Sequence, residues 1–130
     1  MKRSPTTFKV GTRPSNLAVA QARAALNQIE LQIEPHRFEI YPLSTAGDRD
    51  RSTDLRQSPA DFFTHDLDTA LLDGTIDCAL HSAKDLPEPL SPKIDWFWLP
   101  HREEPRDALV LRANQTLEDL PPNPIFGISS

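Results

Sequence analysis

The fold is decided by one stretch of the chain, residues 8–43, which reads FKVGTRPSNLAVAQARAALNQIELQIEPHRFEIYPL. Phe8–Thr12 alternates apolar and polar residues as a short strand does, and Arg37–Leu43 repeats that alternation. Between them, Leu17–Leu31 spaces apolar residues as an amphipathic helix does, and Ser15 stands where an N-cap belongs. A strand, a helix and a second strand in this order predict a β-α-β unit with parallel strands.

Further elements continue this alternation toward the C-terminus. Ser58 and Pro59 form a typical helix start and Gly74 a typical helix end, so we expect a helix between them. Gly47–Pro59 is polar and without period, and we expect a loop there, whereas Ile76–Leu80 is predicted as a buried parallel strand. We expect three more strands, at Trp96–Leu99, Ala108–Leu111 and Ile125–Ile128. Each helix should also bury one apolar stripe. The expected buried residues are Leu17, Ala20, Ala24 and Ile29 in the first helix and Phe62, Phe63, Leu67, Ala70 and Leu71 in the second. The predicted fold class is α/β, with a mainly parallel sheet and flanking helices.

Composition narrows the class of protein further. The chain has 130 residues, with 14 Lys and Arg against 19 Asp and Glu, a formal net charge of -5. This acidic balance argues against a nucleic-acid partner, because phosphates are neutralised by clustered Lys and Arg. No apolar run approaches the roughly 20 residues of a membrane helix, no signal peptide follows Met1, and a single cysteine excludes a disulfide scaffold. We therefore expect a soluble, cytoplasmic domain with no membrane or nucleic-acid partner.

Three polar clusters follow the predicted strands, at Thr12–Ser15, Ser44–Asp48 and His81–Asp85. Ligands of parallel α/β sheets bind outside the carboxyl ends of the strands, so these clusters are expected to converge. An Arg and a Lys beside a helix N-terminus favour carboxylate or phosphate binding, and a nearby Asp can protonate a leaving group or stabilise a cation. The spacing predicts an anion-binding cleft with one acid. The histidines show no metal-ligand spacing, so no metal site is expected.

These clusters, in this order, resemble the N-terminal domain of porphobilinogen deaminase, also called hydroxymethylbilane synthase. The most specific piece is Asp77–Pro87, which reads DCALHSAKDLP. The other matching segments are Gly11–Ala18 (GTRPSNLA) with Gln21 and Ala22, Thr69–Leu72 (TALL), Arg102–Ala108 (REEPRDA) and Gly127–Ser130 (GISS). The resemblance therefore spans nearly the whole chain.

The resemblance implies an enzyme of tetrapyrrole (haem) biosynthesis. The family is a transferase that joins four porphobilinogen units into hydroxymethylbilane and releases ammonia at each step. Its pyrrole chain grows on a dipyrromethane cofactor held by a cysteine thioether. The family's first two domains resemble the lobes of periplasmic binding proteins, so the resemblance implies one such lobe here, with a deaminase-like domain at residues 1–102 and a hinge with the first part of a second domain at 103–130.

The site residues implied by the resemblance are carried over position by position. Asp85 matches the catalytic aspartate, which assists loss of the aminomethyl nitrogen and stabilises the cationic pyrrole. Substrate- or cofactor-binding residues are matched by Arg13, Ser15, Lys84, Ser82, Ser129 and Ser130, with Asp48 near the cofactor and Arg56 in place of a family lysine.

The chain also departs from the family pattern. Ala60 stands where a second loop lysine is expected, Ala46 where an arginine is usual, and the loop glycines are missing. Cys78 lies in a predicted buried strand, and the family's attachment cysteine has no match, so we expect no covalently bound dipyrromethane. A truncated form or shortened homologue is expected. The competing interpretation is non-catalytic, either a pyrrole- or anion-binding pseudoenzyme or an interaction module. In the family, a strand that returns from the second domain completes the first domain, so the resemblance implies an open sheet edge here. An open edge predicts a homodimer or a partner chain, with contacts near residues 106–130.

Overall fold

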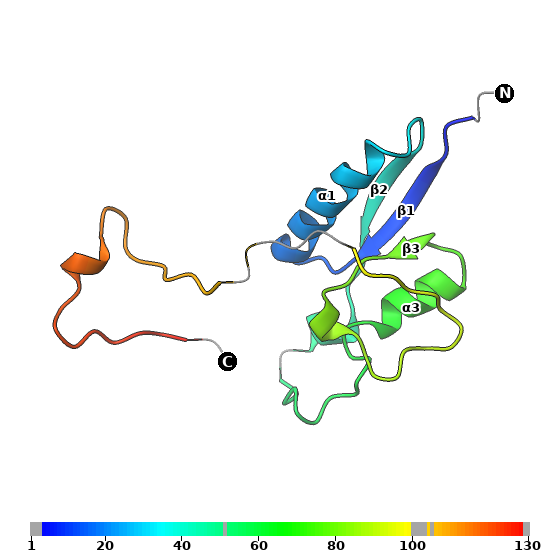
Figure 1. Ribbon diagram of the computed structural model, residues 1–130. Helices are drawn as coiled ribbons and strands as arrows, with labels where there is room; N and C mark the ends of the chain where they lie inside the picture. The colour runs from blue at the N-terminus through cyan, green and yellow to red at the C-terminus, as the bar shows by residue number, and fades with distance from the viewer. Residues whose placement is uncertain (1–3, 51, 100–103, 105, 129–130) are drawn as a thin grey trace.

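The computed structural model describes residues 4–50, 52–99, 104 and 106–128. Helices and strands alternate along the first two thirds of the chain, so the expected α/β class is confirmed (Figure 1). The elements are β1 (Thr7–Thr12), α1 (Asn16–Glu30), β2 (Arg37–Pro42), α2 (Ala46–Arg49), α3 (His65–Leu72) and β3 (Cys78–Ala79), followed by 3-10 turns at Ala83–Asp85 and Leu117–Asp119.

The sheet has three parallel strands in the order β2-β1-β3. Val10 pairs with Ile40 on one side and with Cys78 on the other, and Gly11 pairs with Tyr41 and Ala79 in the same way. The chain moves from β1 to β2 through α1 and then returns past β1 to β3 through α3. With right-handed crossovers, this change of direction places the two helices on opposite faces and opens a crevice at the carboxyl end of β1.

The core lies mainly between α3 and the sheet. Leu67, Ala70 and Ile76 are buried together there, with Tyr41 and Ala79 packed against them. A side chain on Gly11 would meet this cluster, because an added Cβ would lie 2.8 Å from Leu67 Cδ2. The absence of a side chain therefore lets α3 approach β1 closely.

The first predicted helix stripe is wrong except at Ile29, which is half-buried. Leu17, Ala20 and Ala24 are exposed, and the buried residues of α1 are instead Ala22 and Leu26, one turn apart. A three-stranded sheet covers only a narrow strip of the α1 surface. Ala22 and Leu26, which are four residues apart, face β1 and β2 and are buried, whereas Ala20 and Ala24 lie beside this strip and are exposed. Both caps were predicted well: Ser15 Oγ accepts the Ala18 N–H at 3.2 Å, and Gly74 follows α3 with a φ of 79°.

The start of the second helix is also wrong. The helix begins at His65 rather than at Ser58, and residues 59–64 form turns, with Phe62 and Phe63 before the helix instead of on its stripe. The physical reason is a tertiary hydrogen bond: the Phe62 carbonyl accepts the Gly47 N–H at 3.0 Å. Leu67 and Ala70 of the predicted stripe are buried, and Leu71 is half-buried.

Other boundaries differ as well. Part of the expected loop, Ala46–Arg49, is a short helix, because Thr45 and Asp48 form a capping box. The expected strand at Ile76–Leu80 pairs only at Cys78–Ala79. The three strands expected at Trp96–Leu99, Ala108–Leu111 and Ile125–Ile128 are not formed, because none of these segments hydrogen-bonds to the sheet. Residues 106–128 run away from the sheet as an extended segment, orange to red in Figure 1.

Within the part of the chain that the structure describes, no helix is both long and apolar enough to cross a membrane.

Candidate functional site

Arg13 joins two carboxylates at the carboxyl end of the sheet. Its Nε and Nη2 donate to Asp48 Oδ1 at 2.9 and 2.6 Å, and its Nη1 donates to Asp85 Oδ2 at 3.2 Å. The three side chains are 24%, 12% and 14% exposed, respectively. The structure therefore brings together one residue from each of the three polar clusters that the sequence placed after the strands.

Each of these residues is positioned by the end of a secondary-structure element. Arg13 directly follows β1, the central strand, and Asp85 closes the 3-10 turn that follows β3. Asp48 lies in α2, where its Oδ2 accepts the Thr45 N–H at 3.1 Å and the Thr45 hydroxyl at 2.8 Å. Thr45 is itself fully buried, so its contacts hold the Asp48 side chain in place independently of Arg13.

The flat face of the Arg13 guanidinium rests on an aromatic ring. Arg13 Cζ lies 4.1 Å from the centre of the Phe63 ring, a cation–π contact. Gly47 also lies against that ring, because an added Cβ there would lie only 2.9 Å from Phe63 Cζ. Gly47 thus leaves room for the Phe63 ring, and this ring contacts the Arg13 guanidinium that binds the two carboxylates.

The electrostatics of the cluster favour the charged forms. Burial opposes the charge of Arg13, but the adjacent carboxylates of Asp48 and Asp85 outweigh it and raise the pKa of Arg13. Burial likewise opposes ionisation of Asp48, yet the hydrogen bonds from Arg13 and Thr45 lower its pKa. The cluster therefore holds one fixed cation and an ionised Asp48 at neutral pH.

A small cleft of about 60 Å³ opens beside this cluster, between the ends of β1 and β3. On this measure a single water molecule needs about 10–15 Å³, so the cleft has room for a small group such as a carboxylate. Ser82 Oγ donates to Gln21 Oε1 at 3.4 Å across the cleft. Besides Arg13 and Asp85, the lining residues are Thr12, Ser15, Leu17, Ala18, Gln21, Leu80, His81, Ser82 and Lys84.

His81 is a half-buried residue of the cleft lining. Burial lowers its pKa, although the nearby carboxylates of Asp68 and Asp85 act in the opposite direction. Its Nε2 is buried and has no hydrogen-bond partner among the described residues. On the α3 side, burial raises the pKa of Asp68. His81 is therefore neutral at pH 7 and adds no positive charge to the cleft.

Some predicted site residues lie outside this cluster. Arg56 is exposed on the loop after α2, where its Nη2 pairs with Asp54 Oδ2 at 2.7 Å, and it does not line the cleft. Ser129 and Ser130 lie outside the described residues, as do residues 102 and 103, where the predicted domain boundary falls. Cys78 is half-buried in β3, and burial raises the pKa of its thiol, which disfavours the thiolate.

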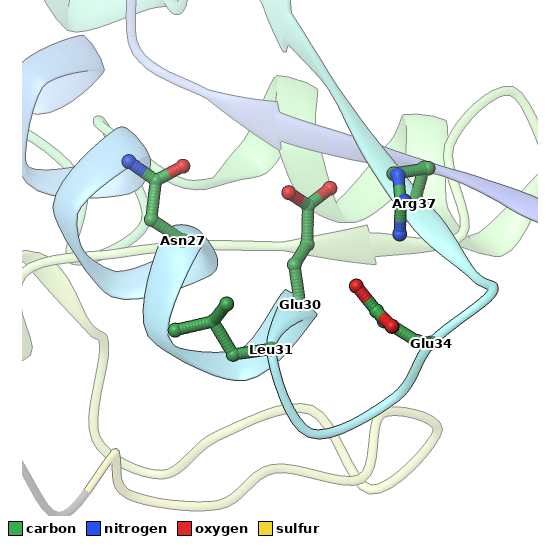
Figure 2. A pocket seen from close by; sticks show the side chains of 5 residues that line it. All are labelled: Asn27, Glu30, Leu31, Glu34 and Arg37. Carbon is green, nitrogen blue, oxygen red and sulfur yellow. The ribbon is translucent and has the colours of Figure 1, made fainter.

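A larger hollow, of about 380 Å³, lies at the opposite end of the strands (Figure 2). Its lining includes Glu30 at the end of α1, Glu34 in the connecting turn and Arg37 at the start of β2. Glu30 Oε1 already accepts the Phe38 N–H at 2.6 Å. The charged residues that line this hollow are Glu30, Glu34 and Arg37, with a net negative charge, whereas Arg13, Lys84 and Asp85 give the lining of the smaller cleft a net positive charge. The smaller cleft is therefore the better anion site. Among the described residues, no group of three or more His, Cys, Asp or Glu side chains is arranged to hold a metal ion.

Sequence reasoning missed Thr45 and the role of Phe63. The Thr45 signal was present, because Thr-x-x-Asp over residues 45–48 is a capping-box pattern. Phe63 carried no comparable signal: its spacing suits a helix stripe, and only the tertiary structure turns its ring toward Arg13 and Gly47.

The fold and site define an α/β domain with a small cleft, lined by Arg13, Lys84 and Asp85, at the carboxyl ends of its parallel strands. Comparison with known proteins identifies the particular family. Residues 8–130 match the family model described as porphobilinogen deaminase, dipyromethane cofactor binding domain. The chain belongs to this family, as the resemblance in its sequence motifs predicted.

Curated relatives agree with this assignment. A porphobilinogen deaminase of Desulfitobacterium hafniense is 38% identical over 125 residues, which are 95% of this chain and 41% of the relative. One of Syntrophomonas wolfei is 39% identical over 124 residues (95% and 40%), and one of Clostridioides difficile is 37% identical over 123 residues (93% and 41%). The chain thus spans about two fifths of the length of the relatives it matches.

Proposed function

We propose that the chain contributes the catalytic acid and an anion-binding wall to a porphobilinogen deaminase, a transferase that condenses porphobilinogen to hydroxymethylbilane with release of ammonia. The observation that carries this proposal is the ion pairing of Arg13 with both Asp48 and Asp85 beside the cleft at the carboxyl end of β1, which Arg13 and Asp85 line. Family membership over residues 8–130 supports the reaction class. A non-catalytic pyrrole-binding role is the second candidate, and the replacement of the loop lysine by Ala60 is the feature that favours it.

The chemistry of the site suits an acidic pyrrole. Porphobilinogen carries an acetate, a propionate and an aminomethyl group on a pyrrole ring. Arg13 and Lys84 would neutralise the carboxylates, and the hydroxyls of Ser15 and Ser82 would complete their hydrogen bonds. Asp85 would assist departure of the amine and then stabilise the positive charge that develops on the ring, as a fixed carboxylate in a half-buried cleft can. Asp48 would hold Arg13 in place.

The same donor set fits the family's dipyrromethane cofactor. Its carboxylates match the cations Arg13 and Lys84, and its pyrrole N–H groups match the acceptor Asp85. When bound, this group supplies the primer on which the pyrrole chain grows. We propose that Cys78 does not attach it, because that thiol is half-buried and its pKa is raised. Arg56, Ser129 and Ser130 remain proposed binding residues by family match alone.

The decisive experiment is a turnover assay with porphobilinogen on the longest natural form of the protein. Asp85→Asn removes the carboxylate charge and keeps the side chain's shape, so it should reduce turnover by at least about a hundredfold. Asp95→Asn removes an exposed carboxylate outside the cleft and should leave turnover unchanged. Unchanged turnover in Asp85→Asn would remove Asp85 from the mechanism, and absence of turnover in the wild type would favour the non-catalytic role.

We also propose a wider setting for the domain. The change of direction at β1 supports a lobe of the periplasmic-binding-protein type, divided near residue 102 from a second unit at 103–130. The family's soluble biosynthetic role supports a cytoplasmic location.

The extended segment supports the proposal that this chain pairs with a second copy or a partner chain. Leu109, Val110, Ile125, Phe126 and Ile128 are all at least half exposed, and no segment of the described residues pairs with the outer edges of β2 and β3. Light scattering of the purified chain across concentrations should show a dimer, whereas a monomer throughout would contradict self-association.

A further inference from the structure

The two carboxylates that share Arg13 are held very differently. Asp48 uses both oxygens: Oδ1 accepts from Nε and Nη2 of Arg13, and Oδ2 accepts from the N–H and hydroxyl of Thr45. Asp85 makes a single side-chain hydrogen bond within the described part of the chain, to Nη1 of Arg13. At 3.2 Å that bond is the longest of the three. The Asp48 side of the guanidinium is therefore anchored and the Asp85 side is the weaker one.

The guanidinium also keeps unused donors on its weak side. Arginine carries five N–H groups in one plane, and the cluster uses three of them. Both Arg13 and Asp85 line the cleft, whereas Asp48 does not. Phe63 supports the guanidinium plane from one face, which limits tilting. A carboxylate that enters the cleft therefore approaches Arg13 beside Asp85 and competes with Asp85 for the same guanidinium.

We infer that a ligand carboxylate displaces Asp85 from Nη1 of Arg13, while Asp48 keeps the guanidinium in place. This inference rests on the proposed function and specifies how its site works. In the absence of ligand, Arg13 holds Asp85 in an ion pair. Binding of an acidic ligand exchanges one carboxylate for another at Nη1 and frees Asp85 for the ligand's N–H groups or its departing amine. Binding of the ligand carboxylate and release of Asp85 from Arg13 thus occur together. Asp48 is the positioning residue, because it keeps the Arg13 guanidinium in place.

The test is a calorimetric titration of the chain with two probes, porphobilinogen and glutarate, a dicarboxylate without a pyrrole or an amine. Asp85→Asn removes the competing carboxylate, so both probes should bind about two- to tenfold more tightly. Asp48→Asn releases the guanidinium from its anchor and should weaken both probes, although it removes the same charge. The matched control Asp95→Asn should bind both probes as the wild type does. Equal tightening by Asp85→Asn and Asp48→Asn would overturn the exchange, because simple loss of negative charge would then explain both.

A second measurement, a nuclear magnetic resonance titration with glutarate, uses the wild-type chain and therefore does not depend on whether a variant folds. The ¹⁵N signal of Arg13 Nε–H should stay in place when glutarate binds, because Nε remains on Asp48, whereas the ¹³C signal of the Asp85 carboxyl should move. A shift of the Nε–H signal with an unmoved Asp85 signal would overturn the inference, as would the absence of binding by both probes.

These results separate the inference from the proposed function. Tighter glutarate binding by Asp85→Asn without porphobilinogen turnover in the wild type would leave the exchange standing and reject the enzyme. Turnover with no change of probe affinity in Asp85→Asn would reject the exchange and leave the enzyme standing.

Discussion

Replacement of Gly47 by alanine tests whether Phe63 positions the site. The new Cβ would lie 2.9 Å from Phe63 Cζ and closer still to two other atoms of the ring, so the ring must move. Overpacking of this kind costs about 1–3 kcal/mol. Alanine is a better helix former than glycine by up to about 1 kcal/mol, and Gly47 lies in α2, so part of the cost is offset. We expect Gly47→Ala to lower the free energy of unfolding by about 1–2 kcal/mol.

A double-mutant cycle measured by urea denaturation isolates the cause. Phe63→Leu replaces the ring with a smaller side chain, so the alanine Cβ should then fit and its penalty should disappear. The expected coupling is about 1–2 kcal/mol, within the range for residues in contact. If Gly47→Ala costs the same in both backgrounds, the ring does not press on Gly47, and the argument that this glycine seats Phe63 under Arg13 is refuted.

Three further predictions concern the fold around the site. Leu67→Ala should lower the free energy of unfolding by about 2–5 kcal/mol in the same denaturation assay, because Leu67 is fully buried between α3 and the sheet; a loss below about 1 kcal/mol would show that this core is not closely packed. Ser15→Ala should cost about 0.5–2 kcal/mol through loss of the N-cap, whereas Ser15→Asp should retain most of the wild-type stability. His81 has a lowered pKa in the folded chain, so the unfolded chain takes up its proton first as pH falls below about 6.5, and stability is lost in that direction. His81→Gln cannot titrate, so its unfolding free energy should fall less between neutral and mildly acidic pH; identical pH profiles would show that His81 is not buried as a neutral group.

Local patterns in the sequence predicted much of the fold correctly. The strand at Thr7–Thr12, the helix at Asn16–Glu30 and the strand at Arg37–Pro42 follow from alternation, helical spacing and the Ser15 cap. Convergence of the polar clusters followed from the parallel arrangement, because the carboxyl ends of parallel strands share one edge. These predictions depend on near neighbours in the chain, which a sequence shows directly.

Three of the errors share a different physical origin. Trp96–Leu99 has the composition of a strand, but a strand also needs a hydrogen-bonded neighbour, and no local pattern reports one. The helix expected from Ser58 begins at His65, because the Gly47 N–H, distant in sequence, takes the Phe62 carbonyl. The placement of Phe63 against Arg13 is likewise a tertiary contact. These three features are fixed by residues far apart in the chain, whereas the short helix at Ala46–Arg49 was missed although its capping-box pattern is local.

The central claim is that the cleft beside Arg13 and Asp85 receives an acidic pyrrole. The most direct test is nuclear magnetic resonance mapping of the ¹⁵N-labelled chain during titration with porphobilinogen. The account predicts saturable shifts at Gly47, Lys84 and Asp85, with the hollow around Glu30 unaffected. Shifts confined to the Glu30 hollow, or no shifts at millimolar porphobilinogen, would contradict it.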